Sequence, residues 1–232
     1  MTIQTELVRV LDALPDEVGE RGAELRYASL PLCVLDAIYS VGAGHSQAEN
    51  VIERYCAHYD VPRHRPRFER LPRREEQLTI RDLIAQIEAV GPQRFAVEVL
   101  RNRRPTSPGR GRLLRAEAVL AAGYVLDAYG ICVLQDMVGA ATNRALYRNL
   151  CAVPGQSQGT AIRTLFALAG VGQVIKPSPL ARRFFTETLG RPVDTPEAQR
   201  LLEEASAALR PSARWMTAGY LDYAIGNAKL PL

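Results

Sequence analysis

A proline–glycine reversal in the second half of the chain constrains its fold more than any other feature. A helical run ends near residue 152, a turn with the sequence VPGQSQG occupies residues 153–159, and a second helical run continues from Thr160 to Leu168. Two helices joined in this way form a helix-hairpin-helix. Its turn glycines allow close backbone approach. The positive N-terminus of the second helix favours an anion such as a nucleic-acid phosphate.

The rest of the chain is predicted to be helical nearly throughout, which gives an all-α fold class. Strand signals are weak, because alternation of apolar and polar residues is rare. The run from Leu113 to Tyr129 is apolar around most of its circumference and is expected to be buried. Helix start signals, in which a capping residue or a proline precedes an apolar pattern, occur at Thr79 with Asp82, at Ser178-Pro179, at Thr195-Pro196 and at Arg210-Pro211-Ser212.

Composition adds a mild basic bias. The chain has 232 residues, of which 47% are hydrophobic, and a formal net charge of +4. This length suits one large domain or two small ones. Of the 29 basic residues only Lys176 and Lys229 are lysines. Arginine makes bidentate contacts with phosphate, but the same bias is equally expected from genome composition.

Two irregular segments concentrate arginine. Residues 59–74 and 101–115 each contain six arginines among prolines that prevent a helix. Either loop could follow a phosphate backbone. The alternative is a solvated surface loop.

The four cysteines have no spacing that indicates a metal or redox site, so we expect reduced thiols, no metal and no cofactor. Acidic residues interrupt the N-terminal region, which does not resemble a signal peptide. The longest uncharged apolar run is shorter than the 18 residues of a membrane span. These observations predict a cytoplasmic protein with no membrane association.

Several segments, taken in order, resemble the helix-hairpin-helix DNA glycosylase superfamily, whose endonuclease III-like members act in base excision repair. The chain is most similar to a branch without an iron–sulfur cluster. The segments that carry the resemblance are residues 104–107, 116–119, 153–161, 165–170, 174–177 and 221–225.

The resemblance implies two helical subdomains with an intervening cleft. Residues 1–30 and 171–232 would form one subdomain. Residues 31–170 would form a helical bundle, with the helix-hairpin-helix at about 142–170. The implied partner is double-stranded DNA. The implied DNA-binding residues are Gly155, Gln156, Ser157, Gln158, Gly159, Thr160, Arg104, Arg110 and Arg112.

The chain departs from this family at the residues that carry its chemistry. The family's catalytic aspartate corresponds to Ser178, and the Schiff-base lysine of its bifunctional members corresponds to Gly159. Ser178 is either an unorthodox catalytic residue or a helix cap. Lys176 is either a displaced amine nucleophile, a phosphate contact or a solvated residue. The other carboxylates that could act are Asp36, Asp127 and Asp136, unless they cap helices or pair with arginine.

Three functions therefore follow from the sequence. The first is a DNA glycosylase, with or without AP lyase activity, that acts on or recognises damaged or modified bases. The second is a catalytically inactive helix-hairpin-helix module that binds DNA or a protein partner. The third is a helical protein with no nucleic-acid role.

Overall fold

The computed structural model describes residues 3–14, 27–42, 45–65, 71–106, 113–170, 177–213 and 216–227. Over these residues the fold is helical, and extended chain pairs only in two isolated bridges, Tyr27 with His64 and Pro105 with Leu114. The predicted all-α class is confirmed. None of the described helices combines the length and apolar character needed to cross a bilayer.

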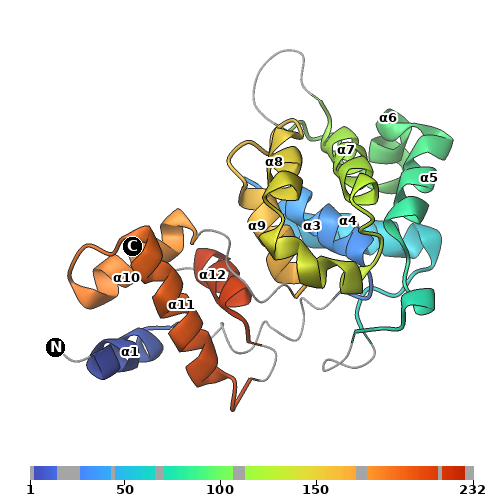
Figure 1. The fold of residues 1–232 in the computed structure, drawn as a ribbon. Helices are drawn as coiled ribbons and strands as arrows, with labels where there is room; N and C mark the ends of the chain where they lie inside the picture. Colours follow the sequence, from blue (N-terminus) through green and yellow to red (C-terminus); the bar gives the residue numbers. More distant parts are fainter. Residues whose placement is uncertain are drawn as a thin grey trace. The chain divides into compact units, whose positions relative to one another are not determined.

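The chain divides into two compact units (Figure 1). Unit 1 contains residues 1–25 and 170–232, so the N-terminal helix packs with the C-terminal helices. Unit 2 contains residues 26–169 and carries the turn at residues 153–159.

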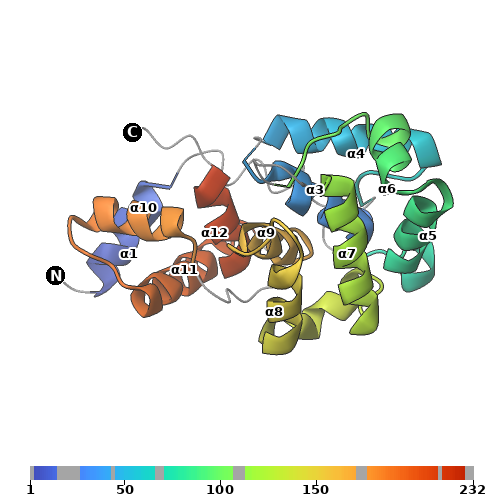
Figure 2. The same cartoon turned by 90° about the horizontal axis from the view of Figure 1, so that it is seen from above.

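Unit 2 is built around α3 (Leu30–Ser40). The sequence LPLCVLDAIY is apolar on every side apart from one aspartate, and all ten of these residues are buried. α3 packs against α4, α7 and α9 (Figure 2). The described elements of this unit are α3, α4 (His45–Tyr59), η1 (Arg74–Glu76), α5 (Ile80–Val90), α6 (Pro92–Arg94), η2 (Phe95–Val99), α7 (Arg115–Ala128), η3 (Leu134–Thr142), α8 (Arg144–Ala152) and α9 (Thr160–Leu168).

Two helix starts confirm the capping predictions. The Thr79 hydroxyl accepts the amide of Asp82 at 3.1 Å, and the Asp82 carboxylate accepts the amide of Thr79 at 2.8 Å, which starts α5. The Ser178 hydroxyl accepts the amide of Ala181 at 3.0 Å and starts α10 (Pro179–Leu189). Gly190, with a φ of 69°, ends that helix.

One helix begins where predicted but has another cap, and one predicted start was wrong. α11 (Thr195–Leu209) is capped by Asp194 and not by Thr195, because the Asp194 carboxylate accepts the amide of Glu197 at 2.9 Å. α12 (Ala218–Asn227) does not begin at residues 210–212. Those residues form the turn that closes α11, since the hydroxyl and amide of Ser212 both donate to the carbonyl of Leu209, at 3.0 and 3.2 Å.

Unit 1 consists, in its described part, of α1 (Ile3–Asp12), α10, α11 and α12. Arg191 joins two of these helices. Its guanidinium donates to Glu6 on α1 at 3.0 Å and to Glu197 on α11 at 2.7 Å. Hydrogen bonds to these two carboxylates raise the pKa of Arg191 above its ordinary value. The N-terminal helix is therefore fixed to the C-terminal helices by charge as well as by apolar packing.

A buried arginine closes the C-terminal end of α3. Arg115 is only 7% exposed. Its guanidinium donates to the carbonyls of Ile38 at 3.2 Å, Tyr39 at 2.6 Å, Val41 at 2.6 Å and Pro105 at 3.3 Å. Burial lowers the pKa of Arg115, but a guanidinium stays charged in proteins. The last carbonyls of the core helix therefore receive their donors from one side chain.

Arg115→Met is expected to lower the free energy of unfolding by roughly 2–4 kcal/mol, because several buried carbonyls lose charged donors. Urea unfolding followed by far-ultraviolet circular dichroism measures the change. Arg94→Met is the matched control, since Arg94 is exposed and pairs only with Glu98 one helical turn away. Equal urea midpoints for the two variants would contradict this role of Arg115.

Candidate nucleic-acid interface

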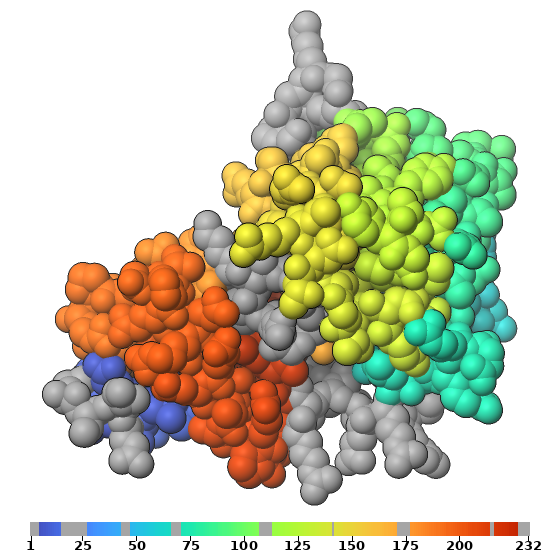
Figure 3. Space-filling model, viewed as in Figure 1, coloured from blue at the N-terminus to red at the C-terminus, as the bar shows by residue number. Residues whose placement is uncertain are grey.

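The predicted reversal is formed by α8, a turn at residues 153–159, and α9. α8 is capped by Asn143, whose side-chain oxygen accepts the amides of Ala145 at 3.1 Å and Leu146 at 3.0 Å. α9 packs against α3 and α8, and its apolar face is buried. In Figure 3 the yellow atoms of α8 lie on the surface of unit 2. The core thus supports the two helices and leaves one side of the hairpin exposed.

Two backbone amides of the turn donate hydrogen bonds to carbonyls of the turn itself. The amide of Gln156 donates to Val153 at 2.9 Å, and that of Gly159 donates to Gln156 at 2.8 Å. Gly155 and Gly159 have φ angles of 82° and 69°, which disfavour other residues. The side chain of Gln156 is 4% exposed and points away from bulk water. Gln156 and Gly159 therefore do not present their amides outward.

The first turn of α9 offers amides instead. The amides of Thr160, Ala161 and Ile162 precede the first intrahelical bond, in which Arg163 donates to the carbonyl of Gly159 at 3.0 Å. Gly159 is the N-cap residue and provides no side chain to accept from them. The amides without an intrahelical acceptor thus lie at residues 160–162, at the end of the predicted set 155–160.

Gly155 contacts the neighbouring loop. A Cβ at this position would overlap the Thr106 Cβ and would lie 3.2 Å from the Thr106 carbonyl oxygen. Thr106 is itself fixed, because its amide donates to the carbonyl of Leu113 at 2.9 Å. The close approach that Gly155 permits is therefore used within the protein. It brings the chain around residue 106 against the hairpin turn.

Gly159 contacts a cluster formed by side chains of α8 and α9. A Cβ there would overlap the Tyr147 hydroxyl and would lie 3.5 Å from the Arg163 guanidinium. Arg163 donates to the carbonyl of Gln158 and the hydroxyl of Thr160, both at 3.3 Å. Burial, followed by the nearby Cys151 thiol, raises the pKa of Tyr147. Its phenol is thus protonated at neutral pH, and it occupies the space that a side chain at 159 would need.

The hairpin lacks negative charge. The sequence has no Asp or Glu between Asp136 and Glu187, nor between Glu98 and Glu117. The packing of Gly155 on Thr106 brings these two segments together. Within the described part of unit 2, the arginines of both segments that make no ion pair are, besides the buried Arg115, the following six: Arg101, Arg103, Arg104, Arg144, Arg148 and Arg163.

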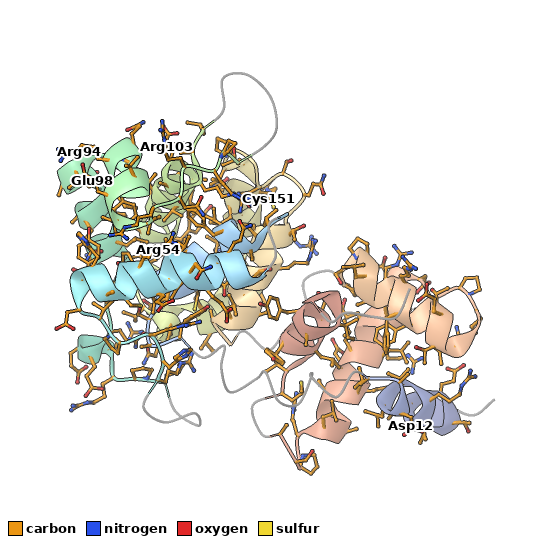
Figure 4. The ribbon with its side chains drawn as sticks, turned by 180° about the vertical axis from the view of Figure 1, so that it is seen from behind. Asp12, Arg54, Arg94, Glu98, Arg103 and Cys151 are labelled. Carbon is orange, nitrogen blue, oxygen red and sulfur yellow. The ribbon has the colours of Figure 1, made fainter. Side chains whose placement is uncertain are left out.

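Several other arginines of unit 2 are paired with carboxylates. Arg74 donates to Asp136 at 2.5 Å, Arg81 to Asp127 at 2.6 Å, and Arg94 to Glu98 at 3.0 Å. Figure 4 shows Arg94 and Glu98 together at the edge of this unit. Carboxylates neutralise these three arginines, whereas the six named above make no ion pair.

The other predicted DNA-binding residues have varied environments. Ser157, Gln158 and Thr160 are exposed in the turn and at the start of α9. Arg104 is exposed in the segment that contacts the hairpin. The three predicted residues outside the described part of the chain are Arg110, Arg112 and Lys176.

Ser178 lies in unit 1 and acts as a helix cap. Besides accepting the Ala181 amide, it donates its own amide to the Asp222 carboxylate at 2.8 Å. Asp222 is 5% exposed and belongs to α12. The sequence marked the Ser-Pro cap, but no signal linked Asp222 to it, because the two residues are 44 positions apart.

The alternative carboxylates are engaged in structural contacts. Asp127 pairs with Arg81. Asp136 accepts the amides of Cys132 at 2.9 Å and Val133 at 3.0 Å. Although partial burial opposes it, these bonds and Arg74 lower the pKa of Asp136. Asp36 is fully buried and accepts the Tyr27 hydroxyl at 2.6 Å.

The cysteines do not form a reactive or metal-binding site in the described part of the chain. All four are free thiols. Burial raises the pKa of Cys33 to about 12 and that of Cys56 to about 11, so both stay protonated. Among the described residues, no group of three His, Cys, Asp or Glu side chains could hold a metal ion.

Comparison with known proteins gives one family. The model described as "Domain of unknown function (DUF8548)" matches residues 5–229, which is nearly the whole chain. No curated protein and no solved structure matches this chain.

Gly159→Ala is expected to destabilise the protein, because its Cβ would overlap the Tyr147 hydroxyl and its φ would be strained. Tyr147→Phe removes the overlapping oxygen and leaves the ring carbon Cζ at 3.3 Å. The double variant should therefore regain part of the thermal stability that Gly159→Ala loses. Thermal unfolding of both single variants and the double variant tests this. Strictly additive losses would exclude a direct contact.

Proposed function

The chain belongs to the DUF8548 family, and we propose that it is a helix-hairpin-helix protein that binds the phosphate backbone of double-stranded DNA. The observation that carries the proposal is the start of α9. Three amides without intrahelical acceptors lie beside the unpaired guanidinium of Arg163, in a segment without acidic residues.

The start of α9 has positive features and no acidic residue to balance them. Acidic residues are favoured in the first turn of a helix, because they interact well with the positive end of its dipole. The first turn of α9 has none, and Arg163 folds back toward this end to bond Gln158 and Thr160. Two positive features thus lie together without a counter-charge, and a phosphate would neutralise both.

Arginines of the adjacent segment would hold further phosphates. Arg104 lies two residues before Thr106, which packs on the hairpin turn. We include Arg110 and Arg112 in the proposed interface as sequence predictions. Contacts of this type are made to the backbone and not to base edges, so binding is expected to depend strongly on salt and little on sequence.

The family resemblance extends the proposal to damaged or modified bases, in the cytoplasm, with the DNA held in a cleft. The geometry favours recognition over cleavage. The Ser178 hydroxyl accepts the amide of its own helix, and the phenol of Tyr147 fills the space beside Gly159. Neither residue carries the carboxylate or amine that glycosidic bond cleavage uses. The carboxylate next to Ser178, that of Asp222, is buried and accepts the Ser178 amide. Lys176 is kept as the alternative nucleophile.

Ser157→Asp and Gln158→Glu are expected to weaken duplex binding by about fivefold or more each, because they add negative charge beside the bound phosphate. Both side chains are exposed, so the fold should be retained. Fluorescence anisotropy with a labelled duplex at about 0.1 M salt measures the affinity. Ala85→Glu, which adds the same charge at an exposed position of α5, is the control. Unchanged affinity of both turn variants would refute the proposal.

Duplexes that carry uracil, oxidised bases, alkylated bases or abasic sites test the enzymatic alternative. We expect binding without base release or strand scission, because the described part of the chain has a cap at Ser178 and no amine at 159. Borohydride trapping on an abasic duplex probes Lys176. A covalent complex that Lys176→Ala abolishes would establish a lyase instead.

A further inference from the structure

Residues Arg101–Arg104, which we name the arginine loop, have an ordered and uncommon backbone. A π-helical turn at Phe95–Val99 precedes the loop, and Arg101 has a φ of 48°. π-helical turns and positive φ angles at non-glycine residues are both rare, and both are enriched at functional sites. The amide of Asn102 donates to Ala96 at 2.8 Å, and its side chain accepts the amide of Arg104 at 3.0 Å. The loop is thus held in one conformation.

Arg54 supports this conformation from α4. Its guanidinium donates to the carbonyls of Leu100 and Arg101, each at 3.2 Å. These are the carbonyls next to the strained residue. Figure 4 shows Arg54 on α4 and Arg103 near the edge of unit 2. Arg54 has no carboxylate partner among the described residues, so its charge serves the loop backbone.

The other end of the loop is fixed to α7 and to the hairpin. The amide of Arg115 donates to the carbonyl of Arg104 at 3.0 Å. Two residues later, Thr106 packs against Gly155. The arginine loop and the hairpin turn are therefore parts of one connected surface in unit 2.

The side chains of this loop are exposed cations without counter-ions. Arg101, Arg103 and Arg104 are exposed, and none makes an ion pair within the described chain. Three like charges within four residues of one loop repel one another, and an anionic partner would relieve that repulsion. A regular chain of phosphates suits such fixed guanidinium groups, because arginine binds phosphate in a bidentate manner.

We infer that the arginine loop extends the DNA surface beyond the hairpin, and that Arg54 is a positioning residue that holds this loop for phosphate binding. The inference rests on the proposed DNA binding and adds residues Arg54, Arg101 and Arg103 to it. Arg54 acts through the loop backbone and the loop arginines contact the phosphates.

Salt-dependent anisotropy with the full chain and a labelled duplex tests the loop. Arg103→Gln/Arg104→Gln is expected to weaken binding about tenfold near 0.1 M salt, and to reduce the slope of log affinity against log salt by about 2, as for two lost phosphates. Arg81→Gln/Arg94→Gln makes the same charge change at arginines paired with carboxylates, and should leave affinity unchanged. Equal losses in both double variants would overturn the loop as a specific surface.

A double-mutant cycle tests Arg54. Arg54→Gln is expected to weaken binding several-fold in the wild-type background and to have no further effect in Arg103→Gln/Arg104→Gln, because a positioning residue needs the side chains that it positions. Additive losses would show that Arg54 binds phosphate itself and would overturn the positioning role. Thermal unfolding confirms that each variant is folded at the assay temperature.

The outcomes separate this inference from the proposed function. Loss of binding in Ser157→Asp with full binding in Arg103→Gln/Arg104→Gln would overturn the arginine loop and retain the hairpin. Absence of duplex binding by the wild-type chain would overturn both. Loss in both sets of variants supports one surface that includes the loop and the turn.

Discussion

The guanidinium of Arg115 connects the core of unit 2 to the surface that we propose binds DNA. The guanidinium donates hydrogen bonds to the last carbonyls of α3 and to the carbonyl of Pro105. The backbone amide of Arg115 donates to the carbonyl of Arg104. Thr106 follows directly and packs on Gly155. The position of the hairpin turn relative to the core helix therefore depends on a short series of contacts that begins at one buried charge. A buried charge can be tolerated here because carbonyl dipoles surround it.

Local signals in the sequence predicted the helix starts that depend on contacts between residues close in sequence. Thr79 with Asp82 and Ser178 with Pro179 start helices because each cap bonds an amide within three residues. The turn at residues 153–159 was also predictable, because proline and glycine separate two helical runs there. At Asp194 and Thr195 two capping residues are adjacent, and the carboxylate takes the role. The ordinary preference of N-caps for aspartate over threonine agrees with this outcome.

The contacts that shape the candidate interface were not predictable, because they join residues that are distant in sequence. Gly155 was expected to allow the close approach of a nucleic-acid backbone. Thr106 of the same chain occupies that space instead. Gly159 was considered as the site of a lost lysine, yet the Tyr147 phenol occupies that space. The absence of acidic residues in two segments was visible in the sequence. The structure was needed to show that these segments lie together and that Arg74, Arg81 and Arg94 pair with carboxylates elsewhere in unit 2.

The structure also bears on Gly159 and Ser178, the two positions at which the sequence departs from the glycosylases that it resembles. A lysine at 159 would add a third positive group beside Arg163 and the α9 helix start, in a space already filled by a protonated phenol. Glycine removes both conflicts and leaves the amides at residues 160–162 without a side-chain acceptor from position 159. At Ser178 the hydroxyl caps α10, while the Asp222 carboxylate accepts the amide before it. Ser178 therefore stabilises the start of α10, and glycine at 159 avoids an overlap with the Tyr147 phenol at the start of α9.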